Sequence, residues 1–142
     1  MPSVFTRIID GELPGRFVWT DEQAVVFLSI APITLGHSLV VPRVEVDHWL
    51  DLDPPVWTHC SQLAQTIGQG IQRAFDPPRV GQMIAGFEVP HMHIHVAQIH
   101  DLADLSFDRA DPDADPGEMD AAADAIRVAL RELGHSEHVP TT

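Results

Sequence analysis

His91-Met92-His93-Ile94-His95-Val96-Ala97 is the stretch that decides the fold, because three histidines alternate with apolar residues. Successive side chains of a β-strand point to opposite faces, so the three histidines share one face. Met92, Ile94 and Val96 share the other face and can be buried. Because imidazole changes its charge near neutral pH, the histidine row predicts acid–base, nucleophilic or metal chemistry.

Zinc is the main rival explanation for three histidines. On one strand, positions i and i+4 lie about 13 Å apart, whereas zinc needs each imidazole nitrogen at about 2.0–2.1 Å. His91 and His95 therefore cannot share one ion on an unbroken strand. Further ligands would have to come from His37, Glu45, Glu88 and His100. None of these has a diagnostic spacing, so we expect no metal and no cofactor. A purely structural role would require hydrogen-bond partners for all three rings.

Composition and charge limit the class of protein. The chain has 142 residues, one cysteine and a formal net charge of −13. This length fits a single domain over residues 1–142. All eight basic residues are unclustered arginines, so we expect no nucleic-acid partner. The first residues lack signal-peptide features, and no apolar run approaches the roughly 20 residues that span a bilayer. We therefore expect a cytoplasmic protein with no membrane contact.

Short apolar runs, separated by glycine, proline and polar residues, predict an α+β fold with a mainly antiparallel five-stranded sheet. The expected strands are Phe17–Thr20, Ala24–Leu28, Ser38–Val41, Val80–Phe87 and His91–Ile99. A central helix is expected between Asp53, as N-cap, and Asp76. A C-terminal helix is expected over Pro116–Leu133. We expect residues 101–115 to form an acidic loop and residues 135–142 to form a flexible tail.

A central imidazole flanked by two others suits nucleophilic attack at phosphorus or carbon. The nucleophile must be neutral, with one ring nitrogen free and the other ring N–H held by an acceptor. His93 is the natural nucleophile because it has a histidine on either side. The neighbouring imidazoles can fix its tautomer, stabilise oxyanion charge and protonate a leaving group.

The triad stretch resembles the signature of the histidine triad (HIT) family of nucleotide hydrolases and transferases. Phe5–Pro14 is similar to the family's opening segment, and Phe27–Pro32 followed by Gly36–Pro42 to its central block. The resemblance implies a HIT-like fold, usually in a homodimer whose sheets join. It also implies that His93 attacks the α-phosphate of a nucleotide. The supporting histidines are then His91, His95 and His37.

The resemblance also places a nucleotide pocket. The matching positions are Phe5, Ile8, Phe27, Ser29 and Ile30, with Glu88 and Val89 near the expected phosphate. Four of these, Phe5, Ile8, Phe27 and Ile30, are equally good core residues. Ser29 falls where the family often has an aspartate that binds the ribose hydroxyls. A serine has a single hydroxyl, so it would hydrogen-bond the ribose hydroxyls more weakly than an aspartate does.

Several departures from the family pattern bear on metal and substrate. Ser3, Thr6 and Glu45 stand where many bacterial members carry zinc ligands, so that site is expected to be absent. Val80 replaces a commonly polar residue that approaches the substrate, and Phe87 also departs from the pattern. Together with Glu88, these changes leave the nucleophile intact and put the usual nucleotide specificity in question.

The sequence therefore favours a nucleotide phosphoramidase or hydrolase that cleaves at the α-phosphate of a purine nucleotide or nucleotide conjugate, through a nucleotidyl intermediate on His93. One alternative is a dinucleoside polyphosphate hydrolase, which the charge of −13 disfavours. The other is a nucleotide-binding HIT protein with little catalytic activity.

Overall fold

The computed structural model describes residues 1–142 and contains one antiparallel sheet of five strands. The strands are β1 (Phe17–Thr20), β2 (Ala24–Leu28), β3 (Ser38–Pro42), β4 (Arg79–Met83) and β5 (Ile94–Ile99). Their order across the sheet is β1-β2-β3-β5-β4. The β1–β2 hairpin turns at Asp21, whose carboxylate accepts hydrogen bonds from the backbone of Gln23 and Ala24. The predicted α+β class is confirmed, and β5 lies inside the sheet next to β3 and β4.

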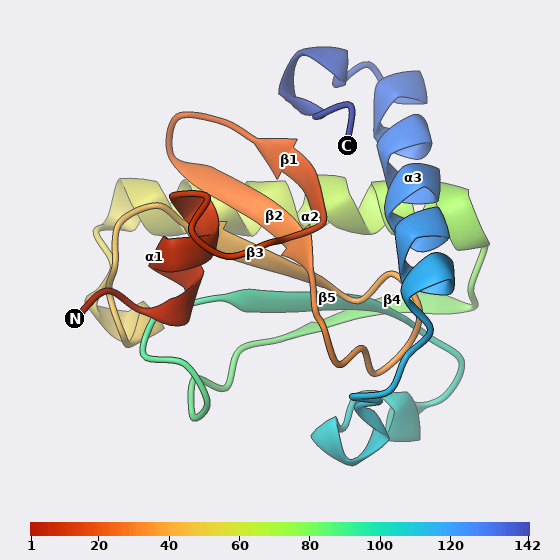
Figure 1. Ribbon diagram of the computed structural model, residues 1–142, viewed down its shortest axis with the longest axis horizontal. Coiled ribbons are helices and arrows are strands. Elements are labelled where there is room, and N and C mark those ends of the chain that lie inside the picture. The colour runs from red at the N-terminus through yellow and green to blue at the C-terminus, as the bar shows by residue number, and fades with distance from the viewer.

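A long helix covers one face of the sheet (Figure 1). This helix is α2 (Pro54–Phe75), and it begins and ends where its proline and Asp76 predict. Its apolar stripe packs with α3 (Pro116–Glu132) and with the inward side chains of the strands to form the main core. Met92, Ile94 and Val96 belong to this core, as the alternation predicts. Burying this face turns the alternate residues, the histidines, toward the opposite face of the sheet.

A short helix that the sequence pattern did not reveal covers that opposite face. The helix is α1 (Val4–Ile9), and the Ser3 hydroxyl caps it by accepting a hydrogen bond from the Thr6 backbone. Phe5 on α1 packs with Phe27, Leu39 and neighbouring strand residues in a second, smaller core. The N-terminal segment therefore forms a lid-like layer in front of the sheet (Figure 1).

The strand containing the triad is shorter than predicted. We expected a strand over His91–Ile99, but β5 begins at Ile94, so only His95 lies in a regular strand. The backbone N–H of His91 instead donates to the Val89 carbonyl, and that of Met92 donates to the Val46 carbonyl. The preceding strand also ends early, at Met83 rather than Phe87. These two hydrogen bonds keep the N–H groups of His91 and Met92 out of the strand ladder.

The acidic segment is irregular, whereas part of the chain end packs against the main core. Residues 101–115 are irregular as expected, with short 3-10 turns at Leu102–Asp104 and Phe107–Arg109. Within residues 135–142, for which the sequence predicts a flexible tail, His138 stacks on Trp19 and Val139 is buried in the main core. None of the helices combines the length and apolar character needed to cross a bilayer.

Candidate active site

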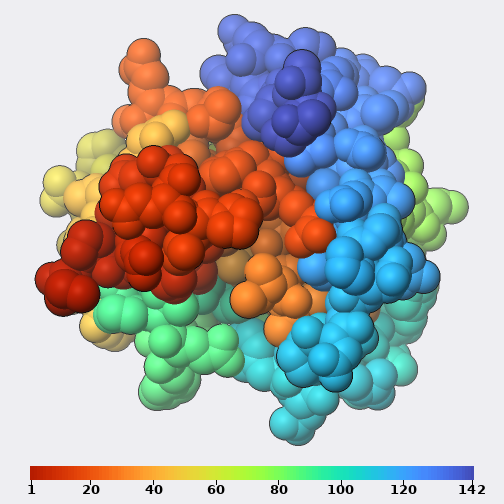
Figure 2. All heavy atoms as spheres, viewed as in Figure 1, coloured from red at the N-terminus to blue at the C-terminus, as the bar shows by residue number.

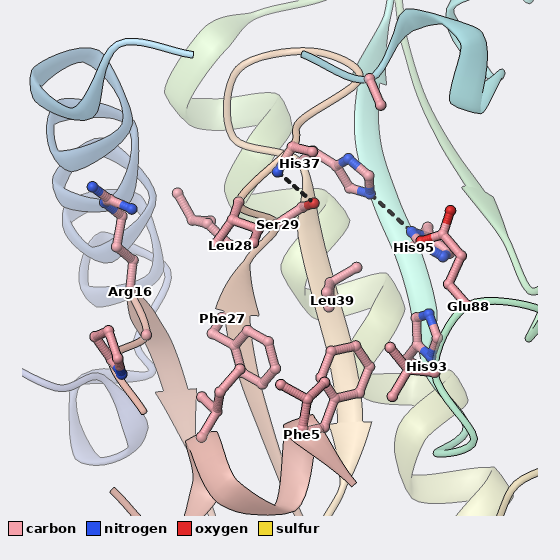
Figure 3. A pocket seen from close by; sticks show the side chains of 18 of the residues that line it. Phe5, Arg16, Phe27, Leu28, Ser29, His37, Leu39, Glu88, His93 and His95 are labelled. Atoms are coloured by element: carbon pink, nitrogen blue, oxygen red, sulfur yellow. Dashed lines mark hydrogen bonds between the residues drawn. The ribbon is translucent and has the colours of Figure 1, made fainter. Parts of the chain in front are cut away.

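The histidine face opens into a cavity of about 660 Å³. Figure 2 shows this face of the molecule, with the N-terminal segment on one side and the segment that leads into α3 on the other. His93, His95 and His37 lie at one end of the cavity and Arg16 lies across from them (Figure 3). Most of the wall between the two ends is apolar. Such a cavity fits a small molecule with one apolar part and one polar end.

His93 is held in one tautomer by the main chain. Its Nδ1 lies 2.8 Å from the carbonyl oxygen of His91, which can only accept a hydrogen bond. The proton of the neutral ring must therefore sit on Nδ1, which leaves the lone pair of Nε2 free. The ring of Phe5 meets His93 edge-on at 4.8 Å and fixes its orientation. His93 therefore has the arrangement that a nucleophilic imidazole needs.

His95 is held in the opposite tautomer by a relay from His37. The Ile33 N–H donates to Nδ1 of His37 at 3.1 Å, so His37 carries its proton on Nε2. That Nε2–H donates to Nδ1 of His95 at 2.9 Å, which places the His95 proton on Nε2 (Figure 3). The rings of His93 and His95 lie 4.7 Å apart. A free lone pair and a ring N–H donor thus stand side by side at one end of the cavity.

The loop before His37 depends on a glycine. Gly36 has a φ of +85°, a conformation that side-chain-bearing residues rarely adopt. A Cβ at this position would also come within 2.6 Å of the Phe75 ring on α2. Gly36 therefore lets the β2–β3 loop approach the helix and bring His37 behind His95.

His91 lies outside the cavity. Its ring is fully buried, and Nε2–H donates to the Pro42 carbonyl at 2.7 Å while Nδ1 accepts from the Ser3 hydroxyl at 2.7 Å. The sequence predicted a histidine face open to substrate, and this is wrong for His91. The physical reason is α1 and its cap, because Phe5 on the helix and the capping Ser3 cover the ring.

A polar cluster joins Ser3, Thr6, Glu45 and His91. The Glu45 carboxylate accepts hydrogen bonds from the Ser3 backbone at 2.6 Å and from the Thr6 hydroxyl at 2.7 Å. Tetrahedral zinc sites are built from cysteine, histidine and carboxylate ligands, and two of the four residues here are hydroxyl residues. No group of three or more histidine, cysteine or acidic residues is arranged to hold a metal ion. The residues present therefore do not fit a zinc ion, and hydrogen bonds join them instead.

Burial keeps the histidines neutral. Burial, together with the smaller effect of the nearby His93, lowers the pKa of His37 to about 4 and that of His95 to about 3. Burial also lowers the pKa of His93, although its bond to the His91 carbonyl and the charge of Glu88 oppose the shift. At neutral pH, His93 therefore has the unprotonated Nε2 that nucleophilic attack requires.

The lowered pKa values predict that acid destabilises the fold. Between the ordinary histidine pKa of 6.5 and the folded value of about 4 for His37, the unfolded chain binds a proton that the folded chain does not. As the pH drops through this range, the free energy of unfolding should decrease. Each histidine whose pKa is lowered in the folded chain should contribute about 1.4 kcal/mol per pH unit. Urea unfolding at stepped pH values would measure the slope. A His37→Leu variant should show a shallower slope, and equal slopes would contradict the assignment.

The structure brings ten of the eleven predicted site residues to the same cavity. They are Phe5, Ile8, Phe27, Ser29, Ile30, His37, Glu88, Val89, His93 and His95. His91 is the exception. Val80 does not line the cavity either, because it lies on β4 and packs against the main core. Phe87 is exposed and lies beside a smaller hollow that also touches His93.

Sequence reasoning missed several residues that line the cavity, most of them in the second half of the chain. Phe107 and Ala110, from the acidic segment, line the cavity, and the Phe107 ring lies 5.0 Å from that of His95. Asp120 on α3 and Arg16 before β1 also line it. No periodicity or motif marks these positions. Leu39 could have been found, because its pairing with Phe27 in the β2–β3 ladder follows from the hairpin register.

Comparison with known proteins identifies related sequences and folds. The model of the HIT domain family matches residues 10–101. An uncharacterized HIT-like protein of Mycobacterium tuberculosis is 36% identical over 106 residues, which are 68% of this chain and 70% of that protein.

Two solved structures have the same fold. A zinc-bound histidine triad family protein from Mycobacterium smegmatis superposes with a TM-score of 0.79 at 27% identity, covering 94% of this chain and 96% of that one. A hypothetical histidine triad nucleotide-binding protein from Sulfolobus tokodaii superposes with a TM-score of 0.76 at 24% identity, covering 91% and 92%.

Proposed function

Because this chain belongs to the HIT family, we propose that it cleaves a bond at the α-phosphate of a purine nucleotide or nucleotide conjugate, with His93 as the nucleophile. HIT proteins are generally nucleotide hydrolases or transferases, and the similar Sulfolobus tokodaii protein is described as nucleotide-binding. The observation that carries the proposal is the pair of opposite tautomers. His93 offers a lone pair through Nε2, and His95 beside it offers an N–H through Nε2.

The reaction proceeds in two displacements. In the first, the Nε2 lone pair of His93 forms a bond to the α-phosphorus while the bond to the leaving group breaks and its electron pair departs with that group. The Nε2–H of His95 donates a hydrogen bond to the phosphate oxygens, and the departing atom takes up a proton from solvent. In the second, water attacks phosphorus, the bond to His93 breaks, and its electron pair returns to Nε2. The attacking water releases a proton to solvent, which replaces the proton that the leaving group took up.

Glu88 has a defined electrostatic role in this scheme. Its side chain lies beside His93 and His95 at the cavity (Figure 3) and forms no ion pair. A carboxylate disfavours a phosphate nearby, but it stabilises the positive imidazolium that His93 becomes when phosphorus is attached. In the free protein its charge already opposes the lowering of the His93 pKa by burial. Glu88 therefore favours the covalent intermediate relative to the bound substrate.

The charges around the cavity favour a leaving group that carries no phosphates. Glu88 stands at the histidine end, and the cavity's one basic residue, Arg16, lies across from it. A polyphosphate leaving group would bring several negative charges to an end that offers no cation. We therefore place a phosphoramidate or acyl phosphate bond ahead of a dinucleoside polyphosphate as substrate.

The covalent intermediate provides the experiment. The protein is mixed briefly with a purine nucleoside phosphoramidate, quenched, digested and analysed by mass spectrometry. The expected result is one nucleotidyl group on the peptide that contains His93. Saturable nucleotide binding with neither adduct nor product would instead support a binding protein with little catalytic activity.

We also propose that the chain forms a homodimer through β4. This strand is the edge of the sheet and pairs only with β5, so its outer backbone groups are free to pair with a second copy. A groove rich in glutamine side chains from α2 runs beside it. Light scattering on the purified protein should give the mass of two chains, whereas a one-chain mass at micromolar concentration would contradict the proposal.

A further inference from the structure

The end of the cavity opposite the histidines carries a fixed ion pair. Nε of Arg16 donates to Oδ1 of Asp120 at 2.7 Å, and both residues line the cavity. Arg16 precedes β1 and Asp120 lies on α3, so the pair joins two segments that are 104 residues apart. Arg16 is the only basic residue in the cavity wall and lies across the cavity from His93 (Figure 3).

Both members of the pair retain free hydrogen-bonding capacity. Nη1 of Arg16 has no partner, and Nη2 has only a long contact of 3.5 Å to the Pro116 carbonyl. Oδ2 of Asp120 has no partner either, and its side chain is 68% exposed. The ion pair therefore presents guanidinium donors next to a carboxylate acceptor, with Nε of Arg16 already bonded to Asp120.

We propose that Arg16 and Asp120 read the base edge of a 6-oxopurine nucleotide, with guanine as the preferred base. This inference rests on the proposed function, because a phosphate at His93 directs the rest of the nucleotide away from the histidines. The apolar walls formed by Phe5 and Phe27 then enclose the base, and its polar edge reaches the ion pair.

The hydrogen-bond pattern selects among bases. Guanine presents the acceptors O6 and N7, which match the guanidinium donors of Arg16. Its N1–H and exocyclic amino group can donate to the carboxylate of Asp120. Adenine places an N6 amino donor where guanine has O6, so it would set a donor against the donors of Arg16. Pyrimidines lack N7 and lose the bidentate contact.

Calorimetric binding of GMP, AMP and CMP to the full chain tests the inference. The intact protein should bind GMP at least about tenfold more tightly than AMP. In an Arg16→Met variant, which keeps the apolar stem, the GMP and AMP affinities should agree to within about twofold. Asp120→Asn should lose part of the preference. Arg7→Met is the matched control, because Arg7 pairs with Glu12 outside the cavity, and it should keep the full preference.

The outcomes separate this inference from the function on which it rests. Equal affinities for GMP and AMP in the intact protein would overturn the base subsite alone, as would a preference that survives Arg16→Met. Failure to bind any of the three nucleotides would overturn the proposed function and this subsite together. Thermal unfolding of the variants checks that loss of the ion pair has not unfolded the chain.

Discussion

Replacing His93 by alanine is expected to lower kcat/KM for a purine nucleoside phosphoramidate by at least about a thousandfold. The variant loses the only free imidazole lone pair held between the His91 carbonyl and the cavity. The remaining groups can orient substrate and donate hydrogen bonds, but they cannot form the bond to phosphorus. Steady-state kinetics with the purified variant would measure the loss, and the nucleotidyl adduct should disappear.

A histidine outside the cavity gives the control for this change. His100 follows the last residue of β5, is exposed, and does not line the cavity. His100→Ala should therefore retain kcat/KM within about twofold, as surface changes away from a site usually do. Wild-type turnover in His93→Ala, or an adduct on another residue, would show that the nucleophile has been misassigned.

Replacing His95 by phenylalanine is expected to lower kcat by about a hundredfold to a thousandfold, the usual cost of removing one donor to a developing oxyanion. Phenylalanine keeps the ring against Phe107 but removes the Nε2–H that faces the cavity. KM should change little, because this donor is needed most when charge builds on the phosphate. The adduct on His93 should still form, more slowly, since the nucleophile is intact.

A second histidine-to-phenylalanine change isolates this effect. His138 stacks on Trp19 at the chain end and lies outside the cavity, so His138→Phe should leave kcat unchanged. A rise in KM alone for His95→Phe, with kcat preserved, would mean that His95 binds the substrate and the transition state equally. The relay from His37 would then serve the fold rather than the reaction.

Local sequence patterns predicted much of the fold. The β1–β2 hairpin, α2 with its Asp76 terminus, and α3 with Asp115 as its cap follow from alternation, helical periodicity and capping residues. These signals are local, since each depends on residues a few positions apart. The cavity positions Phe27 and Ser29 follow from the family resemblance instead.

The remaining features depend on contacts between distant segments. The six residues of α1 are too few for a periodic signal, and their helix is stabilised by the Ser3 cap and by packing on β2. Once α1 and Phe107 are in place, His91 is fully covered, and His93 and His95 line the enclosed cavity. The Arg16–Asp120 pair likewise forms only when α3 packs beside β1. Sequence patterns that span only a few residues cannot predict contacts between segments so far apart in the chain.

The two ring tautomers differ in their vulnerability to genetic change. The proton on His93 is positioned by a main-chain carbonyl, an atom that every amino acid supplies, so no codon change at position 91 deletes it. The proton on His95 is positioned by the imidazole of His37, which a single substitution removes. A single substitution at position 37 would therefore release the His95 tautomer while leaving that of His93 in place. Such a variant would keep its nucleophile but would have a poorly oriented donor beside it.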